Sequence, residues 1–279
     1  MQHISSNILN AETQYIESDG TTFAYRRFGK PSTIPLVGFQ HFTGTLDNWD
    51  PLILEGLARE REVIIFDNVG VGNTSGSTPD NVTAMAEDAV RFVNALGLNK
   101  IDVLGFSLGG FIVQYLGQKH ANLINKIIIV GSAPQGTEVL AGFPELISNA
   151  MRKDPIELFL HIFFTSSESS RKKGKEVLDR LHLRKVNRDR ESMEQAIMAQ
   201  MKAITGWGTE KPSLDLKKVV QPVLIIQGSD DEMMDSDSSY TLFKELPNAI
   251  LTYYPDAAHG SFYQYPEQFV NQANHFLNH

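Results

Sequence analysis

One short segment constrains this chain more than any other: residues 105–110, with the sequence GFSLGG. The apolar residues 101–104 precede it, and the amphipathic residues 111–120 follow it. This order predicts a strand, a sharp turn and a helix, with Ser107 at the apex of the turn. Such a turn lifts the hydroxyl off the end of a sheet and points the first N–H groups of the helix toward the atom it attacks. Ser107 is therefore a candidate nucleophile.

Short apolar runs rich in β-branched residues recur at long intervals along the rest of the chain. Most are continuous rather than alternating, which is typical of strands buried on both faces of a parallel sheet. Amphipathic patterns between them predict helices, and Asp19-Gly20 predicts a hairpin turn near the N-terminus. We therefore expect an α/β fold with a mostly parallel central sheet and flanking helices. The predicted strands are 14–18, 22–28, 35–39, 63–67, 101–106, 126–131, 223–228 and 250–254, and the helices are 48–59, 82–96, 111–120, 239–246 and 266–277.

One interval breaks this alternation, because residues 132–222 contain no convincing strand. Helical patterns predominate there, at 144–152, 155–164, 174–183 and 190–204. An insertion of this length in a regular fold is typical of a lid or cap. We therefore predict a core formed by residues 1–132 and 222–279, and a helical cap formed by residues 133–221.

Composition excludes several classes of function. The chain has 279 residues, of which 42% are hydrophobic, enough for a sizeable core. A net charge of −8 argues against a nucleic-acid partner, and the absence of cysteine excludes disulfides and thiolate metal sites. The sequence has no apolar run long enough for a membrane span and no signal-peptide pattern at residues 1–10. We expect a soluble, cytoplasmic protein without a metal or cofactor.

A serine hydroxyl needs a base within hydrogen-bond reach, and a third group that orients the base. His259 lies in a loop after the last predicted strand, at the sheet edge where Ser107 also emerges. Asp231 lies in an acidic loop after the strand 223–228, with Asp230 as the alternative acid. The predicted catalytic residues are therefore Ser107, Asp231 and His259.

This chain order resembles that of the α/β-hydrolase superfamily, in its serine hydrolase branch of esterases and cofactor-free haloperoxidases. The segment 105–110 is similar to the nucleophile elbow of that family, and 228–231 (GSDD) is similar to its acid turn. Residues 258–260 (AHG) resemble the histidine loop, and 66–75 resemble a further loop with the pattern Asp-x-x-Gly-x-Gly. The resemblance covers nearly the whole chain and implies an α/β-hydrolase fold with a variable cap.

The resemblance also implies an oxyanion hole, with one backbone N–H from Leu108 and one from the loop after the third strand. Where the family usually has His-Gly-x, this chain has Gln40-His41-Phe42, which makes Phe42 the second donor. His41 replaces a glycine that allows close approach of the backbone. It either points away from the site as a structural residue or places a second imidazole beside it.

These features predict a serine hydrolase that cleaves a carboxylic ester, thioester or lactone through an acyl-enzyme on Ser107. The expected partner is a small-molecule acyl substrate, while the substrate itself and the oligomeric state are left open. The alternatives are a perhydrolase (cofactor-free haloperoxidase), a C–C bond hydrolase with the same triad, or a ligand receptor with little turnover. The candidate pocket residues are His41, Phe106, Phe143, Phe163 and Trp207.

Overall fold

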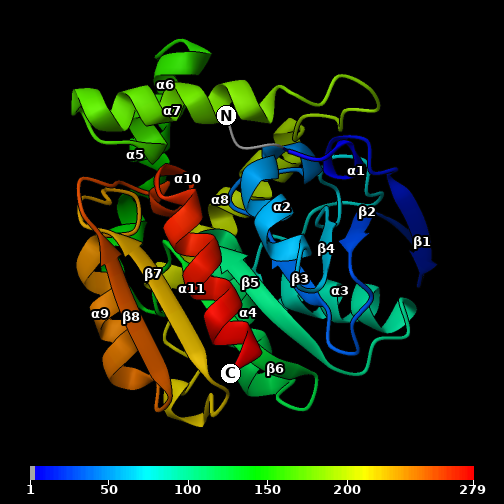
Figure 1. Cartoon of the computed structure of the whole chain (residues 1–279). Helices are drawn as coiled ribbons and strands as arrows, with labels where there is room; N and C mark the ends of the chain where they lie inside the picture. The colour runs from blue at the N-terminus through cyan, green and yellow to red at the C-terminus, as the bar shows by residue number, and fades with distance from the viewer. Residues whose placement is uncertain (1–3) are drawn as a thin grey trace.

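The computed structural model describes residues 4–279 and contains an eight-stranded sheet with the order β1-β2-β4-β3-β5-β6-β7-β8 (Figure 1). β1 and β2 pair antiparallel, as do β2 and β4, and the remaining neighbours pair parallel. This confirms the expected mostly parallel α/β sheet. The strands are β1 (Gln14–Ser18), β2 (Thr21–Gly29), β3 (Leu36–Phe39), β4 (Glu62–Phe66), β5 (Ile101–Phe106), β6 (Ile124–Val130), β7 (Val223–Gly228) and β8 (Ala249–Tyr254).

Helices cover both faces of the sheet, which explains why the inner strands are apolar throughout. In β6, Ile127 and Ile129 belong to one hydrophobic cluster, while Ile128 and Val130 belong to the cluster on the opposite face. Figure 1 shows α2 and α11 in front of the sheet and α3 and α4 behind it. These helices are α2 (Pro51–Ala58), α3 (Val82–Ala95), α4 (Leu108–Lys119) and α11 (Pro266–Asn278), with α9 (Ser236–Glu245) beside β7 and β8.

Turn chemistry sets two of the predicted boundaries. Asp19 and Gly20 both have positive φ values, 46° and 77°, as a tight hairpin turn between β1 and β2 requires. Asn81 caps α3 by accepting a hydrogen bond from Ala84 N at 2.8 Å. The short helices α1 (Ser6–Leu9) and α10 (Ser261–Gln264) and the 3-10 turn η1 (Leu46–Asn48) were not predicted. Each is too short to show a helical period in the sequence.

Between β6 and β7, residues 131–222 form helices and loops without a strand. Figure 1 shows α6 and α7 crossing the upper end of the sheet, where the loops that follow the parallel strands gather. We call residues 133–221 the insertion, and its division from the core at these residues stays a prediction. Its elements are η2 (Glu138–Gly142), α5 (Phe143–Ala150), α6 (Pro155–Phe163), α7 (Glu168–Leu181), α8 (Glu194–Thr209) and η3 (Leu216–Lys218).

Candidate active site

Ser107 occupies the turn between β5 and α4 with a φ of 56° and a ψ of −116°. Few residues other than glycine adopt such a backbone conformation, which costs on the order of 1–3 kcal/mol. Two glycines make the turn sterically feasible. A Cβ on Gly105 would lie 2.4 Å from Gly109 O, and a Cβ on Gly109 would lie 2.2 Å from Phe39 O. The sequence GFSLGG therefore forms the sharp strand–turn–helix that it predicts.

His259 and Asp231 form a buried hydrogen-bonded pair, with 2.8 Å between His259 Nδ1 and Asp231 Oδ2. The other carboxylate oxygen accepts hydrogen bonds from Met233 N at 2.8 Å and Met234 N at 3.1 Å, which fixes the carboxylate. Because a carboxylate accepts, Nδ1 carries a hydrogen, and in the neutral ring Nε2 has the lone pair. Asp230, the alternative acid, is exposed and instead accepts from the hydroxyl of its neighbour Ser229.

A cavity of about 450 Å³ lies between the core and the insertion, and both Ser107 and His259 line it. In the structure of residues 4–279, Ser107 Oγ and His259 Nε2 are not hydrogen-bonded to each other. Such catalytic contacts often tighten only when substrate binds. The apolar wall comes mainly from helices of the insertion and includes Phe143, Ile147, Met151, Phe159, Ile162 and Phe163.

Of the predicted pocket residues, His41, Phe143 and Phe163 line this cavity, while Phe106 and Trp207 lie outside its wall. Phe106 is fully buried behind His259, with 5.1 Å between the ring centroids. Trp207 stacks on Phe111 at 5.0 Å, and its Nε1 donates to Ala133 O at 3.1 Å. Both rings therefore pack the interior, and we correct the sequence prediction for these two positions.

The backbone N–H groups of Phe42 and Leu108 have no acceptor among residues 4–279; Leu108 directly follows Ser107, and Phe42 lines the same cavity as Ser107. In the parallel pairing of β3 with β5, Phe39 lies opposite Gly105. The segments that follow the two strands therefore leave the sheet side by side. Unpaired N–H groups in a water-poor site are suited to stabilise a developing oxyanion.

His41 lines the cavity, and its Nδ1 lies 2.7 Å from Phe42 O. Because a carbonyl oxygen only accepts, Nδ1 carries a hydrogen and the neutral ring keeps a lone pair on Nε2. Burial lowers the pKa of His41 to about 4; the hydrogen bond to Phe42 opposes this, and the charge of His259 lowers the pKa further. His41 thus places a second imidazole beside the site, which was one of the two possibilities that the sequence left open. At neutral pH this imidazole is uncharged.

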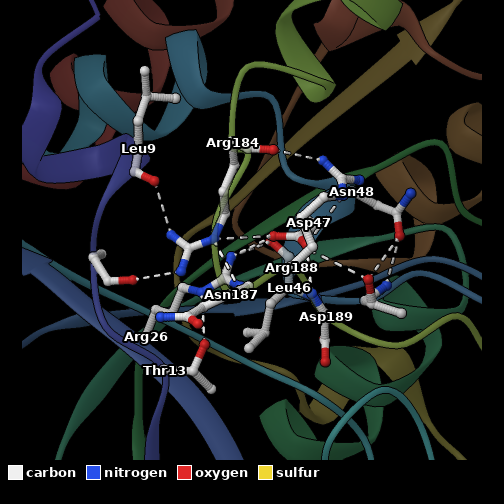
Figure 2. A network of polar contacts seen from close by, with 12 residues as sticks. Leu9, Thr13, Arg26, Leu46, Asp47, Asn48, Arg184, Asn187, Arg188 and Asp189 are labelled. Carbon is white, nitrogen blue, oxygen red and sulfur yellow. Dashed lines mark hydrogen bonds and ion pairs between the residues drawn. The ribbon is translucent and has the colours of Figure 1, made fainter.

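Buried ion pairs beside the cavity fix the insertion to the core. Asp47 accepts a hydrogen bond from Arg26 at 2.6 Å and lies 3.7 Å from Arg184 of the insertion (Figure 2). Asp50, at the start of α2, accepts hydrogen bonds from Arg180 of α7: from Nε at 3.0 and 3.1 Å, and from Nη2 at 2.7 Å. Removing one partner of a buried pair typically costs about 3–5 kcal/mol. These pairs therefore hold the insertion in its place over Ser107.

A pair of carboxyl groups joins the same two parts of the chain. Asp67 follows β4, and Asp189 belongs to the insertion; both accept from Leu46 N, at 2.9 and 3.3 Å. Burial raises the pKa of Asp67 well above its usual range, and the hydrogen bond with Asp189 and the charge of Asp189 raise it further. Two carboxyl groups can share a hydrogen bond only while one of them holds a proton, and the raised pKa of Asp67 favours Asp67 as the group that holds it.

Within residues 4–279, His, Asp and Glu side chains do not gather in groups of three or more that could hold a metal ion. In the same part of the chain, no helix has the length and apolar character needed to cross a membrane.

Comparison with known proteins decides the family. A model of the alpha/beta hydrolase fold matches residues 35–266, which include Ser107, Asp231 and His259. This chain belongs to the alpha/beta hydrolase fold family. A solved alpha/beta hydrolase fold protein from Chitinophaga pinensis is 60% identical, with a TM-score of 0.96 over 97% of this chain and 98% of its own. The family expected from the sequence motifs is confirmed.

Curated relatives are more distant. A non-heme haloperoxidase of Rhodococcus erythropolis is 26% identical over 261 residues, covering 87% of this chain and 91% of the relative. A pimeloyl-(acyl-carrier protein) methyl ester esterase of Aeromonas hydrophila is also 26% identical, over 264 residues, covering 90% and 97%. Hydrolases and esterases among such relatives support an enzyme of the α/β-hydrolase class.

Sequence reasoning missed the polar residues that join the insertion to this site. Asp67 falls within the segment 66–75, which resembles a family loop, but its partner Asp189 lies in an irregular stretch without a motif. Met233 also lines the cavity and was not predicted. Contacts between segments so far apart in the chain leave no local signal in one sequence.

The variant His41→Gln tests whether His41 takes part in proton transfer. Because burial keeps the pKa of His41 at about 4, the residue stays neutral from about pH 5.5 to 8. The pH dependence of kcat/KM should therefore keep the shape of the wild-type profile in this range, even if its height changes. If the rising or falling part of the pH profile shifts or disappears in the variant, the titration of His41 contributes to the reaction.

The variant Asp67→Asn tests the carboxyl pair. An amide can donate to Asp189 at every pH, whereas Asp67 can donate only while it is protonated. The stability that protonated Asp67 contributes is present at low pH and is lost as the pH rises through its raised pKa. The variant should therefore gain stability relative to the wild type as the pH rises above the usual carboxyl range of about 4.

The measurement is the free energy of unfolding by urea at several pH values, with Asp80→Asn as a matched control. Asp80 is exposed, and its hydrogen bond to Lys202 lowers its pKa, so this control should differ from the wild type by a constant amount over those pH values. A constant difference for Asp67→Asn as well would contradict a proton held between Asp67 and Asp189.

Proposed function

We propose that this protein is a serine hydrolase that cleaves a carboxylic ester, thioester or lactone through an acyl-enzyme on Ser107. One observation carries the proposal: the buried pair of His259 Nδ1 and Asp231 Oδ2, 2.8 Å apart, in a cavity that Ser107 also lines. The hydrogen bond leaves a lone pair on His259 Nε2. A base oriented in this way beside a strained serine is the arrangement that activates a hydroxyl.

The reaction follows from this geometry. His259 Nε2 takes the proton of Ser107 as Oγ attacks the acyl carbon, and Asp231 stabilises the imidazolium that forms. The N–H groups of Phe42 and Leu108 bind the oxyanion of the tetrahedral intermediate. His259 then returns the proton to the leaving oxygen or sulfur, which leaves the acyl group on Ser107. Water, deprotonated by His259, attacks this ester and releases the acid.

The cavity supports a small acyl substrate. Its volume of about 450 Å³ falls within the range typical of small-molecule sites. Phenylalanine, isoleucine and methionine side chains from the insertion form its apolar wall, while Asp47, Asp189 and Glu191 lie on its polar side. An apolar acyl chain fits the aromatic side. The relative named as a methyl ester esterase also favours ester cleavage.

A second candidate is acyl transfer to hydrogen peroxide, which would produce a peracid. It is favoured by three relatives named as non-heme haloperoxidases or chloroperoxidases. The same acyl-enzyme serves both reactions, because hydrogen peroxide then replaces water as the nucleophile. Peracid formation from acetate and hydrogen peroxide, measured beside ester hydrolysis, separates the two. Turnover of a conjugated diketone through C–C cleavage would favour a C–C bond hydrolase, the activity suggested by the relative named as a dienoic acid hydrolase.

The variant Ser107→Ala tests the proposed nucleophile. The wild type should turn over p-nitrophenyl butyrate many times, and the variant should lose about 10⁴-fold or more in kcat, because nothing replaces the attacking oxygen. The measurement is steady-state release of p-nitrophenol. Ser169→Ala, at an exposed position of α7, serves as the matched control and should keep wild-type activity. Unchanged turnover in Ser107→Ala would contradict the proposal, and one covalent event per chain without turnover would favour a receptor.

A further inference from the structure

The insertion forms hydrogen bonds with the backbone N–H and the backbone carbonyl of Thr43. Thr43 lies in the loop of residues 40–44, which we call the oxyanion loop because it carries the Phe42 N–H. Thr43 N donates to Gln200 Oε1 at 2.6 Å, and Thr43 O accepts from Ser192 Oγ at 2.8 Å. Gln200 lies on α8, and Ser192 lies just before that helix. Thr43 directly follows Phe42, whose N–H is a candidate oxyanion donor. The insertion therefore contacts the loop that carries this donor.

The loop needs such support, because Thr43 has a φ of 62° without being a glycine. A conformation of this kind persists only where surrounding contacts determine it. Within the loop, Gly44 N donates to His41 O at 3.0 Å, and His41 N donates to Gln40 Oε1 at 2.9 Å. These bonds close the turn on itself but do not fix it relative to Ser107. Gln200 and Ser192 provide contacts from outside the loop.

Gln200 is fully buried, and its Nε2 has no hydrogen-bond partner among residues 4–279. A buried amide with one unpaired group is unfavourable compared with an apolar side chain of the same length. The bond that Gln200 does make is the one to Thr43. The side chain is thus better explained by its effect on the loop than by a contribution to stability.

We propose that Gln200 and Ser192 are positioning residues that hold the Phe42 N–H in the oxyanion hole from the insertion. Catalysis then requires the insertion to be docked on the core, because the donor is placed only when α8 is in position. This inference rests on the proposed serine hydrolase function. It gives the insertion a second role besides lining the substrate pocket: its residues place the Phe42 N–H that stabilises the transition state.

The chain offers a matched control on the same helix. Gln195 also joins α8 to a backbone segment of the core: its Oε1 accepts from Thr78 N and its Nε2 donates to Thr78 O, both at 3.0 Å. Thr78 lies in the loop between β4 and α3, not in the loop of residues 40–44. Loss of Gln195 therefore removes a comparable contact between α8 and the core but leaves both contacts to residues 40–44, while the ion pairs of Asp47 and Asp50 keep the insertion docked.

The experiment compares Gln200→Met, Ser192→Ala and Gln195→Met in the full chain, with p-nitrophenyl butyrate as substrate. Methionine keeps the length of glutamine and removes the acceptor. We expect Gln200→Met to lower kcat by about 10- to 100-fold with KM within about two-fold, since loss of a whole oxyanion donor typically costs about 10²- to 10³-fold. Ser192→Ala should act in the same direction, and Gln195→Met should stay within about two-fold of the wild type in kcat.

A second readout does not depend on activity. Hydrogen exchange of the amides in residues 40–44 should be faster in Gln200→Met than in Gln195→Met, because Thr43 N loses its acceptor only in the former. Gln200→Glu, which keeps an oxygen acceptor, should restore slow exchange and most of kcat.

Equal losses of kcat in the two methionine variants, or unchanged exchange at residues 40–44 in Gln200→Met, would overturn the inference while leaving the hydrolase intact. If the wild type shows no ester turnover, or shows turnover that Ser107→Ala does not abolish, the proposed function is refuted. The catalytic part of the positioning role is then refuted with it. The exchange data would then still show whether Gln200 holds the loop.

Discussion

The backbone at Ser107 is the constraint on which the rest of the site depends. Its φ of 56° is unfavourable for any residue with a side chain, and hydrogen bonds with the end of β6 and with Ser132 just after it hold it there. Ser107 N donates to Val130 O at 2.9 Å, and Ser132 Oγ donates to Ser107 O at 3.0 Å. The parallel pairing of β5 with β6 therefore fixes the turn from outside. A well-packed sheet core supplies the free energy that this local strain requires.

From that turn, the other groups follow through the geometry of a parallel sheet. The loops after β3, β5 and β7 leave the same edge, as does the loop that carries His259 after β8. Asp231 is fixed by two backbone N–H groups, His259 by Asp231, and the imidazole ring by the aromatic side chains of Phe106 and Phe163. Each group is thus oriented by a rigid neighbour, which is the condition for a preorganised active site. The insertion completes the cavity and contacts the loop of residues 40–44.

The sequence was most informative where a local rule determines the structure. Continuous apolar runs predicted β5 and β7 with their observed bounds, and the glycines of residues 105–110 predicted the turn at Ser107. The structure also brings Asp231, rather than Asp230, to His259. Predictions failed where tertiary packing decides: Trp207 looked like a pocket residue but stacks on Phe111. The contact of Gln200 with Thr43 spans 157 residues of sequence and follows no periodic pattern.

The central claim is that Ser107 carries the acyl group during turnover. The most direct measurement is mass spectrometry of peptides from protein quenched in acid while it hydrolyses p-nitrophenyl acetate. The proposed mechanism predicts one acetyl group on the peptide that contains Ser107, and its disappearance once the substrate is exhausted. Steady hydrolysis with this peptide unmodified, or with the acetyl group on another residue, would contradict it.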